Sequence, residues 1–324
     1  MSVSLRNIQE PIKAELATFE RKFRESMKSD VPLLDRITHY IVQKKGKQLR
    51  PLLVLLSAAV CGKITESTYR SASFVEMIHT ATLVHDDVVD ESYLRRGFFS
   101  INALWKNKIA VLVGDYLFSR SLLLATDHKE YELLQILNLA VKKMSEGELM
   151  QMEKSRKLNI TEEQYLHIIS QKTASFIAAA CQAGAASGGA TEEEQMQMHQ
   201  VGQYMGMAFQ IKDDLFDYGK AKIGKPKGID IQEKKMTLPL IKALQDSDKE
   251  ERRRILRLVK NHKNDKKKIR EVIDYVHQSD GISYTENLMR EYQQKALDIL
   301  VHFSPSVYKE AFVDLLGFVT DRQK

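Results

Sequence analysis

The sequence predicts an all-α protein, and three observations carry this prediction. The 324 residues include only six prolines and fifteen glycines, so few positions would interrupt a helix. Apolar residues recur at i, i+3, i+4 and i+7 over long stretches, whereas no series of alternating strands stands out. No Pro- or Ser-rich linker divides the chain. We therefore expect residues 1–324 to form a single helical domain.

Composition narrows the class of protein further. Cys61 and Cys181 lie in apolar or small-residue surroundings without metal-ligand spacing, as buried reduced thiols do. The longest strongly apolar run, residues 51–61, is too short to cross a bilayer, and the charged N-terminus does not resemble a signal peptide. The net charge is +6, with no basic patch interleaved with aromatic residues, which argues against nucleic acid. We expect a cytoplasmic protein, for which anionic small molecules remain open as ligands.

Two helices are expected near the N-terminus, over residues 8–27 and 31–44. The following loop carries Gly46, Lys47 and Arg50 just before an apolar core helix. Glycine permits a tight turn, and a Lys and an Arg three residues apart can bind one phosphate group together. The alternative is a basic loop that only caps the core helix.

The next helix carries an acidic motif within residues 76–97. Asp86, Asp87 and Asp90 would lie at about 0°, 100° and 40° around its axis, which places them on one face. Like charges this close destabilise a helix, so we expect a bound cation. Oxygen ligands without nearby Cys favour Mg²⁺, which takes one or two carboxylates and leaves room for phosphate oxygens. The alternative is a solvated acidic turn at a helix end.

Three basic residues flank this motif. His79 would lie on nearly the same face, about 10 Å along the axis from Asp86, where it could bind a second anion or be a buried core histidine. Arg95 and Arg96 follow the motif by just over one turn. They could form ion pairs with the aspartates, bind phosphate in a bidentate fashion, or do each at a different stage of binding.

Two further helices are expected over residues 105–125 and 131–154. After them, Lys172 and Thr173 lie in an alanine-rich stretch whose small side chains suit close helix packing. A lysine in such surroundings needs an anionic partner, which could be a diphosphate or a neighbouring Glu.

A second acidic motif repeats the spacing of the first, with Asp213, Asp214 and Asp217 inside an apolar helical segment. Gln210 lies one turn before Asp214 on the same side, and Gly206, another turn back, would permit close approach by a neighbouring element. We expect the two acidic helices to face each other across a cavity and to hold several divalent ions between them. Such a cluster would bind a diphosphate.

Basic residues dominate two later segments. Lys220, Lys222, Lys225 and Lys227 alternate with glycines in residues 218–228, as in a mobile flap that closes over an anion; the alternative is a solvated loop. A basic run over residues 251–270 is typical of a solvated helix face, and contact with anionic lipid headgroups is the alternative.

Five motifs resemble, in the same order, those of the trans-isoprenyl diphosphate synthases, also called the polyprenyl synthetase family. They are GKQLRP, HDDVVDESYLRRG, QKTA, FQIKDDLFD and GKPKGIDIQEKKMTLP, and the resemblance covers about residues 30–300. It implies an isoprenoid synthase fold, a bundle of helices around a deep central cavity, usually as a homodimer. It also implies Mg²⁺-dependent head-to-tail addition of isopentenyl diphosphate to an allylic diphosphate.

The resemblance also implies roles for the motif residues. Six aspartates would hold Mg²⁺, about three ions per active site, and so bind the allylic diphosphate: Asp86, Asp87, Asp90, Asp213, Asp214 and Asp217. Four cations would complete this binding: Arg95, Lys172, Lys225 and Lys235. Thr173 and Gln210 match residues near the reacting carbons of the allylic diphosphate. Isopentenyl diphosphate would contact Gly46, Lys47, Arg50, His79 and Arg96. One departure is Lys234, where many members have glycine.

The implied chemistry needs no protein nucleophile. Breaking an allylic C–O bond places charge on the departing diphosphate, which metal ions and cationic side chains stabilise. The double bond of isopentenyl diphosphate then attacks the carbocation, and the released diphosphate can remove the proton that restores the alkene. A closed flap would keep water from the cation.

Product length depends on the residues that line the cavity upstream of Asp86. In this family, bulky aromatics four or five positions upstream stop growth early, and here those positions are the small Thr82 and Ala81. We therefore expect a hexaprenyl to nonaprenyl product, octaprenyl first, of the kind used for quinone side chains, with geranylgeranyl as the alternative. The floor of the cavity would come from Phe74, Met77 and Ile78, or from Leu133 and Leu137 on a neighbouring helix.

Other classes of protein explain fewer of these residues. A class I terpene cyclase shares one Asp-rich motif but not the second DDLFD motif or GKQLRP. A metal phosphohydrolase, suggested by His85 beside Asp86, leaves the second acidic motif unexplained. A non-catalytic partner subunit is the alternative that is not an enzyme, although such subunits typically lose an aspartate triad and this chain keeps both. Transient membrane contact would serve release of a lipid product.

Overall fold

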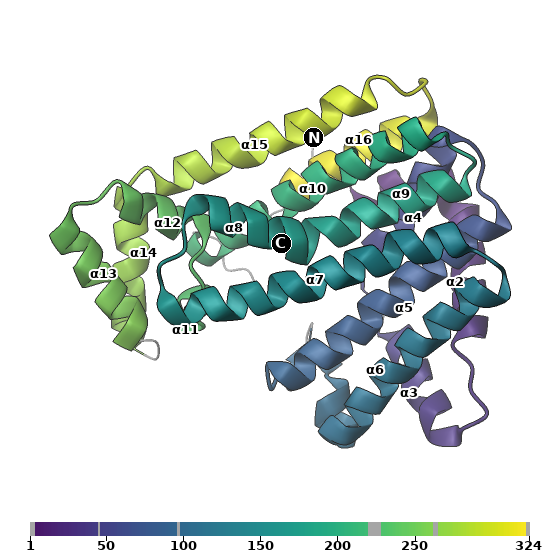
Figure 1. The fold of residues 1–324 in the computed structure, drawn as a ribbon, viewed down its shortest axis with the longest axis horizontal. Coiled ribbons are helices and arrows are strands. Elements are labelled where there is room, and N and C mark those ends of the chain that lie inside the picture. Colours follow the sequence, from purple (N-terminus) through teal and green to yellow (C-terminus); the bar gives the residue numbers. More distant parts are fainter. Residues whose placement is uncertain (1–3, 45, 96–97, 220–227, 262–264, 322–324) are drawn as a thin grey trace.

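The computed structural model describes residues 4–44, 46–95, 98–219, 228–261 and 265–321, and these residues are almost entirely helical (Figure 1). The only strands described are β1 (Leu94–Arg95) and β2 (Phe98–Phe99), which pair antiparallel with Leu94 opposite Phe99. This two-residue ladder follows the first acidic motif directly. The predicted all-α class is therefore confirmed.

The helices follow one another with short connections. The first half of the chain contains α1 (Leu5–Gln9), η1 (Glu10–Ile12), α2 (Lys13–Ser26), α3 (Pro32–Gln43), α4 (Leu49–Cys61), α5 (Glu66–Val89), α6 (Ile101–Asp127) and α7 (Tyr131–Lys157). The second half contains α8 (Glu162–Ile169), η2 (Ser170–Ala174), α9 (Ser175–Ser187), α10 (Glu192–Tyr218), α11 (Ile229–Gln232), α12 (Leu238–Gln245), α13 (Lys249–Asn261), α14 (Lys266–Gln278), α15 (Gly281–Leu300) and α16 (Val307–Asp321).

Local sequence explains where several helices begin. Thr65, Thr161 and Thr191 are N-cap residues of α5, α8 and α10, and each forms a capping box with the residue three positions later. The first turn of α10 contains three glutamates, whose charges complement the positive end of the helix dipole. Pro32 occupies the first turn of α3, as its fixed φ favours.

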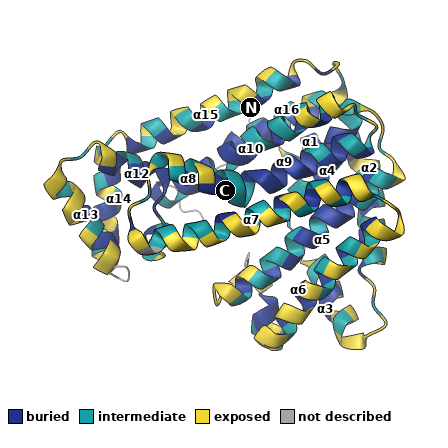
Figure 2. Ribbon diagram, in the orientation of Figure 1, coloured by how far each residue is buried: buried dark blue, intermediate teal, exposed yellow. Residues whose placement is uncertain are grey.

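The core of the bundle is formed by α4, α5 and α9. Residues 51–58 of α4 are buried, and most of α9 is too, so these helices form the dark interior of Figure 2. The small side chains of α9 permit unusually close packing, because a Cβ on Gly184 would come within 2.3 Å of the Val54 carbonyl oxygen. Cys181 is buried and Cys61 half-buried, and both are free thiols. Close helix packing by the alanine-rich stretch is thereby confirmed.

The buried apolar residues form two clusters. The larger one is built by the N-terminal helices with α9 and α16, and the smaller one by α8 and α11 to α15. Helix α10 contributes to both, through Val201 and Met205 to the larger cluster and through Ile211 and Leu215 to the smaller. In Figure 1 it runs through the middle of the molecule, with α15 alongside. The second acidic motif lies in the half of α10 that faces the smaller cluster.

Helix α6 packs along α5 and has an apolar outer side. Among the helices of the described residues, α6 alone is long and apolar enough to cross a membrane by length and composition. A third of its most apolar 18-residue segment is buried. Four large apolar residues of α6 are exposed: Leu104, Val111, Leu112 and Leu123. The helix is kinked at Lys106, between Leu104 and Val111, where φ is 70°.

Candidate active site

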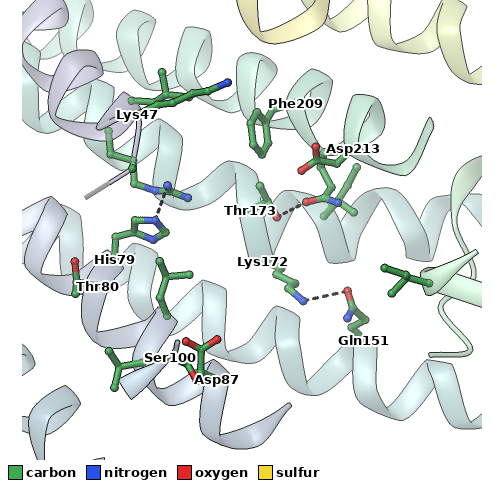
Figure 3. Close-up of a pocket in the computed structure, with 18 of the residues that line it drawn as sticks. Lys47, His79, Thr80, Asp87, Ser100, Gln151, Lys172, Thr173, Phe209 and Asp213 are labelled. Carbon is green, nitrogen blue, oxygen red and sulfur yellow. Dashed lines mark hydrogen bonds between the residues drawn. The ribbon is translucent and has the colours of Figure 1, made fainter. Parts of the chain in front are cut away.

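A cavity of about 910 Å³ opens between α4, α5, α7, α8, α10 and α11 (Figure 3). Its size is that of a pocket for a drug-sized ligand or for two smaller ones. Most of the site residues expected from the sequence line it: Gly46, Lys47, Arg50, His79, Asp87, Lys172, Thr173, Gln210, Asp213, Asp214, Asp217 and Lys235. The fold thus brings segments far apart in the chain to one hollow, with α5 and α10 both contributing carboxylates to its wall.

Asp214 is the most deeply buried carboxylate of the second acidic motif. Its Oδ2 accepts a hydrogen bond of 2.6 Å from the Tyr165 hydroxyl, and its Oδ1 one of 3.0 Å from the Gln210 amide. Burial and the nearby charge of Asp230 raise the pKa of Asp214 to about 7, although both hydrogen bonds oppose this rise. Without a cation, this carboxylate is therefore held at an energetic cost.

Asp217 connects the end of α10 to α11. Its two carboxylate oxygens accept the backbone N–H groups of Ile229 at 3.0 Å and Asp230 at 3.2 Å. Burial raises the pKa of Asp217, and the backbone hydrogen bonds oppose the rise. Asp213 is half-buried and also lines the cavity, so all three aspartates of this motif reach it.

The three aspartates of the first motif lie at the end of α5. The helix ends at Val89, and the C-cap Asp90 keeps αR backbone angles, with its N–H still bonded to the Asp86 carbonyl oxygen. Asp87 is buried and lines the cavity, whereas Asp86 and Asp90 are exposed. The expectation that all three carboxylates share one face stays a prediction. The amide of Asn102, from α6, donates to the Asp87 backbone oxygen at 3.0 Å and fixes this end of α5.

The donor set suits a hard divalent cation that arrives with its ligand. Within the described ranges, no three His, Cys, Asp or Glu side chains converge closely enough to hold a metal ion by themselves. Mg²⁺ usually takes only one or two carboxylates and completes its shell with water and phosphate oxygens. Carboxylates on both α5 and α10 would therefore hold such ions together with water and phosphate oxygens.

The opposite end of the cavity is cationic. Figure 3 shows Lys47 and His79 on the side away from Asp213. The Arg50 guanidinium lies 2.8 Å from Nε2 of His79, and because Arg has only donors, this nitrogen must accept. The bond thus requires a neutral His79 with its proton on Nδ1. His79 is half-buried in the cavity wall, so the core-histidine alternative is not what the structure has.

Lys172 and Thr173 belong to η2, a π-helical turn between α8 and α9. The Lys172 ammonium pairs with Glu148 of α7 at 2.5 Å and donates to Gln151 at 3.4 Å, so a neighbouring Glu is its partner here. The Thr173 hydroxyl donates to the Gln210 carbonyl oxygen at 3.0 Å. A π-helical turn inserts an extra residue into the helix and often marks a functional site. Here it directs both side chains into the cavity.

Two glycines of neighbouring helices hold η2 closely. A Cβ on Gly147 of α7 would lie 2.6 Å from the Lys172 backbone nitrogen. A Cβ on Gly206 of α10 would lie 2.5 Å from the Cα of Ala174. The predicted close approach at Gly206 is confirmed, and η2 fits between α7 and α10 because both positions lack a side chain.

The segment after α11 contributes Lys235 to the cavity. Its ammonium pairs with Glu233 at 2.5 Å. Burial opposes its charge, but the hydrogen bond and charge of Glu233, with Asp230 and Asp90, outweigh burial and raise the pKa of Lys235. The preceding Lys234 has a φ of 58°, in the left-handed region that favours glycine. This explains why glycine suits the position where the sequence departs from the family that it resembles.

Some expected residues cannot be assigned to the cavity. Arg96 and Lys225, with Lys220, Lys222 and Lys227, lie outside the described residues, and Arg95 is described only as backbone in β1. The residues expected to set product length are mostly buried in the core, and none is among the described lining residues: Phe74, Met77, Ile78, Ala81, Leu133 and Leu137. Thr82 is half-buried and donates to the His79 carbonyl oxygen. The chain-length assignment stays a prediction.

Sequence reasoning missed three polar groups of the cavity wall. Tyr165, Asp230 and Gln151 line it and contact or influence the predicted residues. Asp230 lies inside the GKPKGIDIQEKKMTLP motif and could have been noticed there. Tyr165 and Gln151 carry no such signal, because their role depends on how α8 and α7 pack.

Comparisons with known proteins agree with this geometry. The sequence model of the polyprenyl synthetase family matches residues 31–276. Octaprenyl diphosphate synthase of Escherichia coli (strain K12) is 33% identical over 99% of this chain and 100% of its own length. All-trans-nonaprenyl-diphosphate synthase (geranyl-diphosphate specific) of Rhodobacter capsulatus is 35% identical over 98% of this chain and 97% of its own. Heptaprenyl diphosphate synthase component 2 of Bacillus subtilis is 33% identical over 88% of this chain and 82% of its own.

A solved structure is similar over the same length. The polyprenyl synthase from Caulobacter crescentus CB15, complexed with calcium and isoprenyl diphosphate, superposes with a TM-score of 0.92 and 34% sequence identity. The superposition covers 100% of this chain and 99% of the other.

Proposed function

This chain belongs to the polyprenyl synthetase family, and we propose that it extends an allylic diphosphate to a long-chain polyprenyl diphosphate with Mg²⁺. It is a trans-prenyl diphosphate synthase, an enzyme whose family uses isopentenyl diphosphate and an allylic diphosphate as substrates. The observation that carries the proposal is one cavity that is lined both by aspartates of α5 and α10 and by Lys47, Arg50 and His79. Two diphosphates of different roles need two such unlike sites.

We assign the acidic end to the allylic diphosphate. Asp87, Asp213, Asp214 and Asp217 line the cavity, and Asp86 and Asp90 are exposed at the end of α5. Bound Mg²⁺ would neutralise the charge that develops on the departing diphosphate and so favour C–O cleavage. Lys172 and Lys235 add positive charge from two other segments, and we assign Arg95 and Lys225 to the same task. Lys172 must exchange Glu148 for the diphosphate when substrate binds.

We assign the cationic end to isopentenyl diphosphate. The guanidinium of Arg50, held by His79, and the ammonium of Lys47 present donors suited to phosphate oxygens. Gly46 belongs to the same wall, and we assign Arg96 to this site by its place in the motif. Between the two ends lie Thr173 and Gln210, whose mutual hydrogen bond fixes the amide beside the reacting carbons. Each group is thus oriented before substrate binds.

For the product we propose octaprenyl diphosphate, with geranylgeranyl diphosphate as the alternative. The small side chains of Ala81 and Thr82 support a long product, as does the similarity to octaprenyl and nonaprenyl synthases. The similar proteins also include one named as a short-chain synthase, so family membership alone does not define length. We further propose that the product supplies quinone side chains.

We propose that the enzyme is a cytoplasmic homodimer formed through α6. The exposed apolar residues of this helix, Leu104, Val111, Leu112 and Leu123, would be covered by a second copy. Transient membrane contact is proposed for α13 and α14, at the far end of the molecule (Figure 1). Arg253, Arg257 and Lys260 form an exposed basic face of α13 that suits anionic headgroups.

The alternative of another class is a partner subunit that is inactive alone. The similarity to a protein named as component 2 of a heptaprenyl diphosphate synthase favours testing it. The retention of both aspartate motifs at one cavity favours an enzyme that acts by itself.

One incubation tests the activity, the product length and the need for a second protein. Purified protein is supplied with farnesyl diphosphate, labelled isopentenyl diphosphate and Mg²⁺, and the dephosphorylated products are sized. We expect one dominant octaprenyl product, and a shorter one from the variant Ala81→Phe. A wild-type product that stops at geranylgeranyl would refute the octaprenyl assignment but keep the activity. No incorporation until a second protein is added would support the partner-subunit alternative.

A further inference from the structure

Tyr165 is a buried cavity residue to which the proposed reaction assigns no role. It lies in α8, one turn and a half before η2, and only 4% of its surface is exposed. Its hydroxyl donates to Oδ2 of Asp214 at 2.6 Å, and Asp214 is itself 5% exposed. A short hydrogen bond between a hydroxyl and a carboxylate in a buried site is among the stronger ones.

The hydrogen bonds to Asp214 restrict how its carboxylate can turn. Tyr165 donates to one oxygen from α8, and Gln210 donates to the other from the preceding turn of α10. Gln210 is in turn fixed by the hydroxyl of Thr173. Two donors from different directions fix the plane of a carboxylate, yet each oxygen keeps a further lone pair for a cation.

We infer that Tyr165 is a positioning residue that orients Asp214 to receive a divalent ion. This inference rests on the proposed function, in which Asp214 holds Mg²⁺ with the allylic diphosphate. Groups that hydrogen-bond to metal ligands fix their orientation, and their loss typically weakens metal binding by 10- to 100-fold. In Tyr165→Phe the ring that packs into the smaller core cluster stays, and only the donor is lost.

The test measures ion binding without turnover. Mg²⁺ is titrated into wild type and Tyr165→Phe in the presence of inorganic diphosphate, and binding is followed by the rise in melting temperature. We expect the Mg²⁺ concentration at the midpoint to rise about tenfold in the variant. In the elongation assay the Mg²⁺ requirement should rise equally, and kcat at saturating Mg²⁺ should stay close to wild type.

Tyr275→Phe is a matched control. The Tyr275 hydroxyl also donates a 2.7 Å hydrogen bond, to the backbone oxygen of Ala243, but it lies in α14 and not among the described lining residues of the cavity. This variant should keep the wild-type Mg²⁺ midpoint even if its melting temperature falls.

The outcomes separate the inference from the proposed function. A Tyr165→Phe midpoint within twofold of wild type would overturn the inference. If diphosphate and Mg²⁺ do not stabilise even the wild-type protein, the proposed metal site fails instead. A double-mutant comparison provides a second test, because removing the Tyr165 hydroxyl in an Asp214→Asn background should leave residual Mg²⁺ binding unchanged. A further loss of binding there would also contradict the inference.

Discussion

Replacing Asp214 with Asn should stabilise the metal-free protein at alkaline pH while abolishing turnover. The substitution keeps the shape of the side chain, and its carbonyl oxygen can still accept from Gln210 while its amide faces the Tyr165 hydroxyl. It removes a buried charge for which the described residues supply no counter-ion in the absence of metal. The predicted gain in stability therefore depends on pH.

The sign follows from the two pKa values of Asp214. In the folded protein its pKa is raised from 3.8 to about 7, mainly by burial, so the native state binds a proton more tightly than the unfolded chain does. The free energy of unfolding then falls as pH rises from about 4 to 7, and the full loss persists above pH 7. Three pKa units correspond to roughly 4 kcal/mol, and the part lost between pH 5 and 8 is about 2–3 kcal/mol. Asn, which does not titrate, escapes this loss.

Urea unfolding in the presence of a chelator at pH 5 and pH 8 measures the effect. The advantage of Asp214→Asn over wild type should grow by about 2–3 kcal/mol between the two values. Asp298→Asn is the control, because Asp298 is exposed on α15 and bonded only locally to Gln294. Its difference from wild type should not change with pH. A constant difference between Asp214→Asn and wild type would refute the reasoning.

Three further changes test other parts of the site. Glu148→Gln removes the ion-pair partner of Lys172, so the KM for the allylic diphosphate should fall by up to about fivefold in steady-state assays, and a higher KM would mean that Glu148 is needed to orient the lysine. Gly147→Ala and Gly206→Ala should each lower the free energy of unfolding by about 1–3 kcal/mol, because their Cβ atoms meet the backbone of η2. In the control Gly317→Ala, no atom lies within 4 Å of the added Cβ, so urea unfolding should show a rise of about 0.5–1 kcal/mol in the free energy of unfolding. Equal effects at the three glycines would contradict the role of Gly147 and Gly206 in the packing of η2. Lys234→Gly relieves a φ of 58° and should raise the midpoint of thermal unfolding through a gain of roughly 0.5–1 kcal/mol, whereas a fall would show that the lysine side chain stabilises this turn.

Much of the fold and the site could be predicted because the signals are local. Helical periodicity and the lack of alternating strands indicated the class, and Asp213, Asp214 and Lys172 occur in short motifs whose residue types already suggest diphosphate binding. The close approach at Gly206 followed from one glycine in an otherwise helical segment.

The remainder depends on packing that spacing does not reveal. Asp87 is buried whereas Asp86 and Asp90 are exposed, and this difference depends on how α6 packs against the end of α5, where Asn102 donates to the Asp87 backbone oxygen. Glu148 was one of several glutamates that could have partnered Lys172. Its choice is decided by how α7 lies against η2.

The close packing of η2 against Gly147 and Gly206 also limits which substitutions evolution can accept in this sequence. Positions 147 and 206 touch no substrate in the proposed reaction, yet any larger residue there would displace the backbone that carries Lys172 and Ala174. The neighbouring Glu146, which faces solvent, has no such restriction. Natural variants of α7 should therefore be diverse at position 146 and invariant at position 147. A substitution at either glycine can thus inactivate the enzyme by adding a side chain, although it removes none.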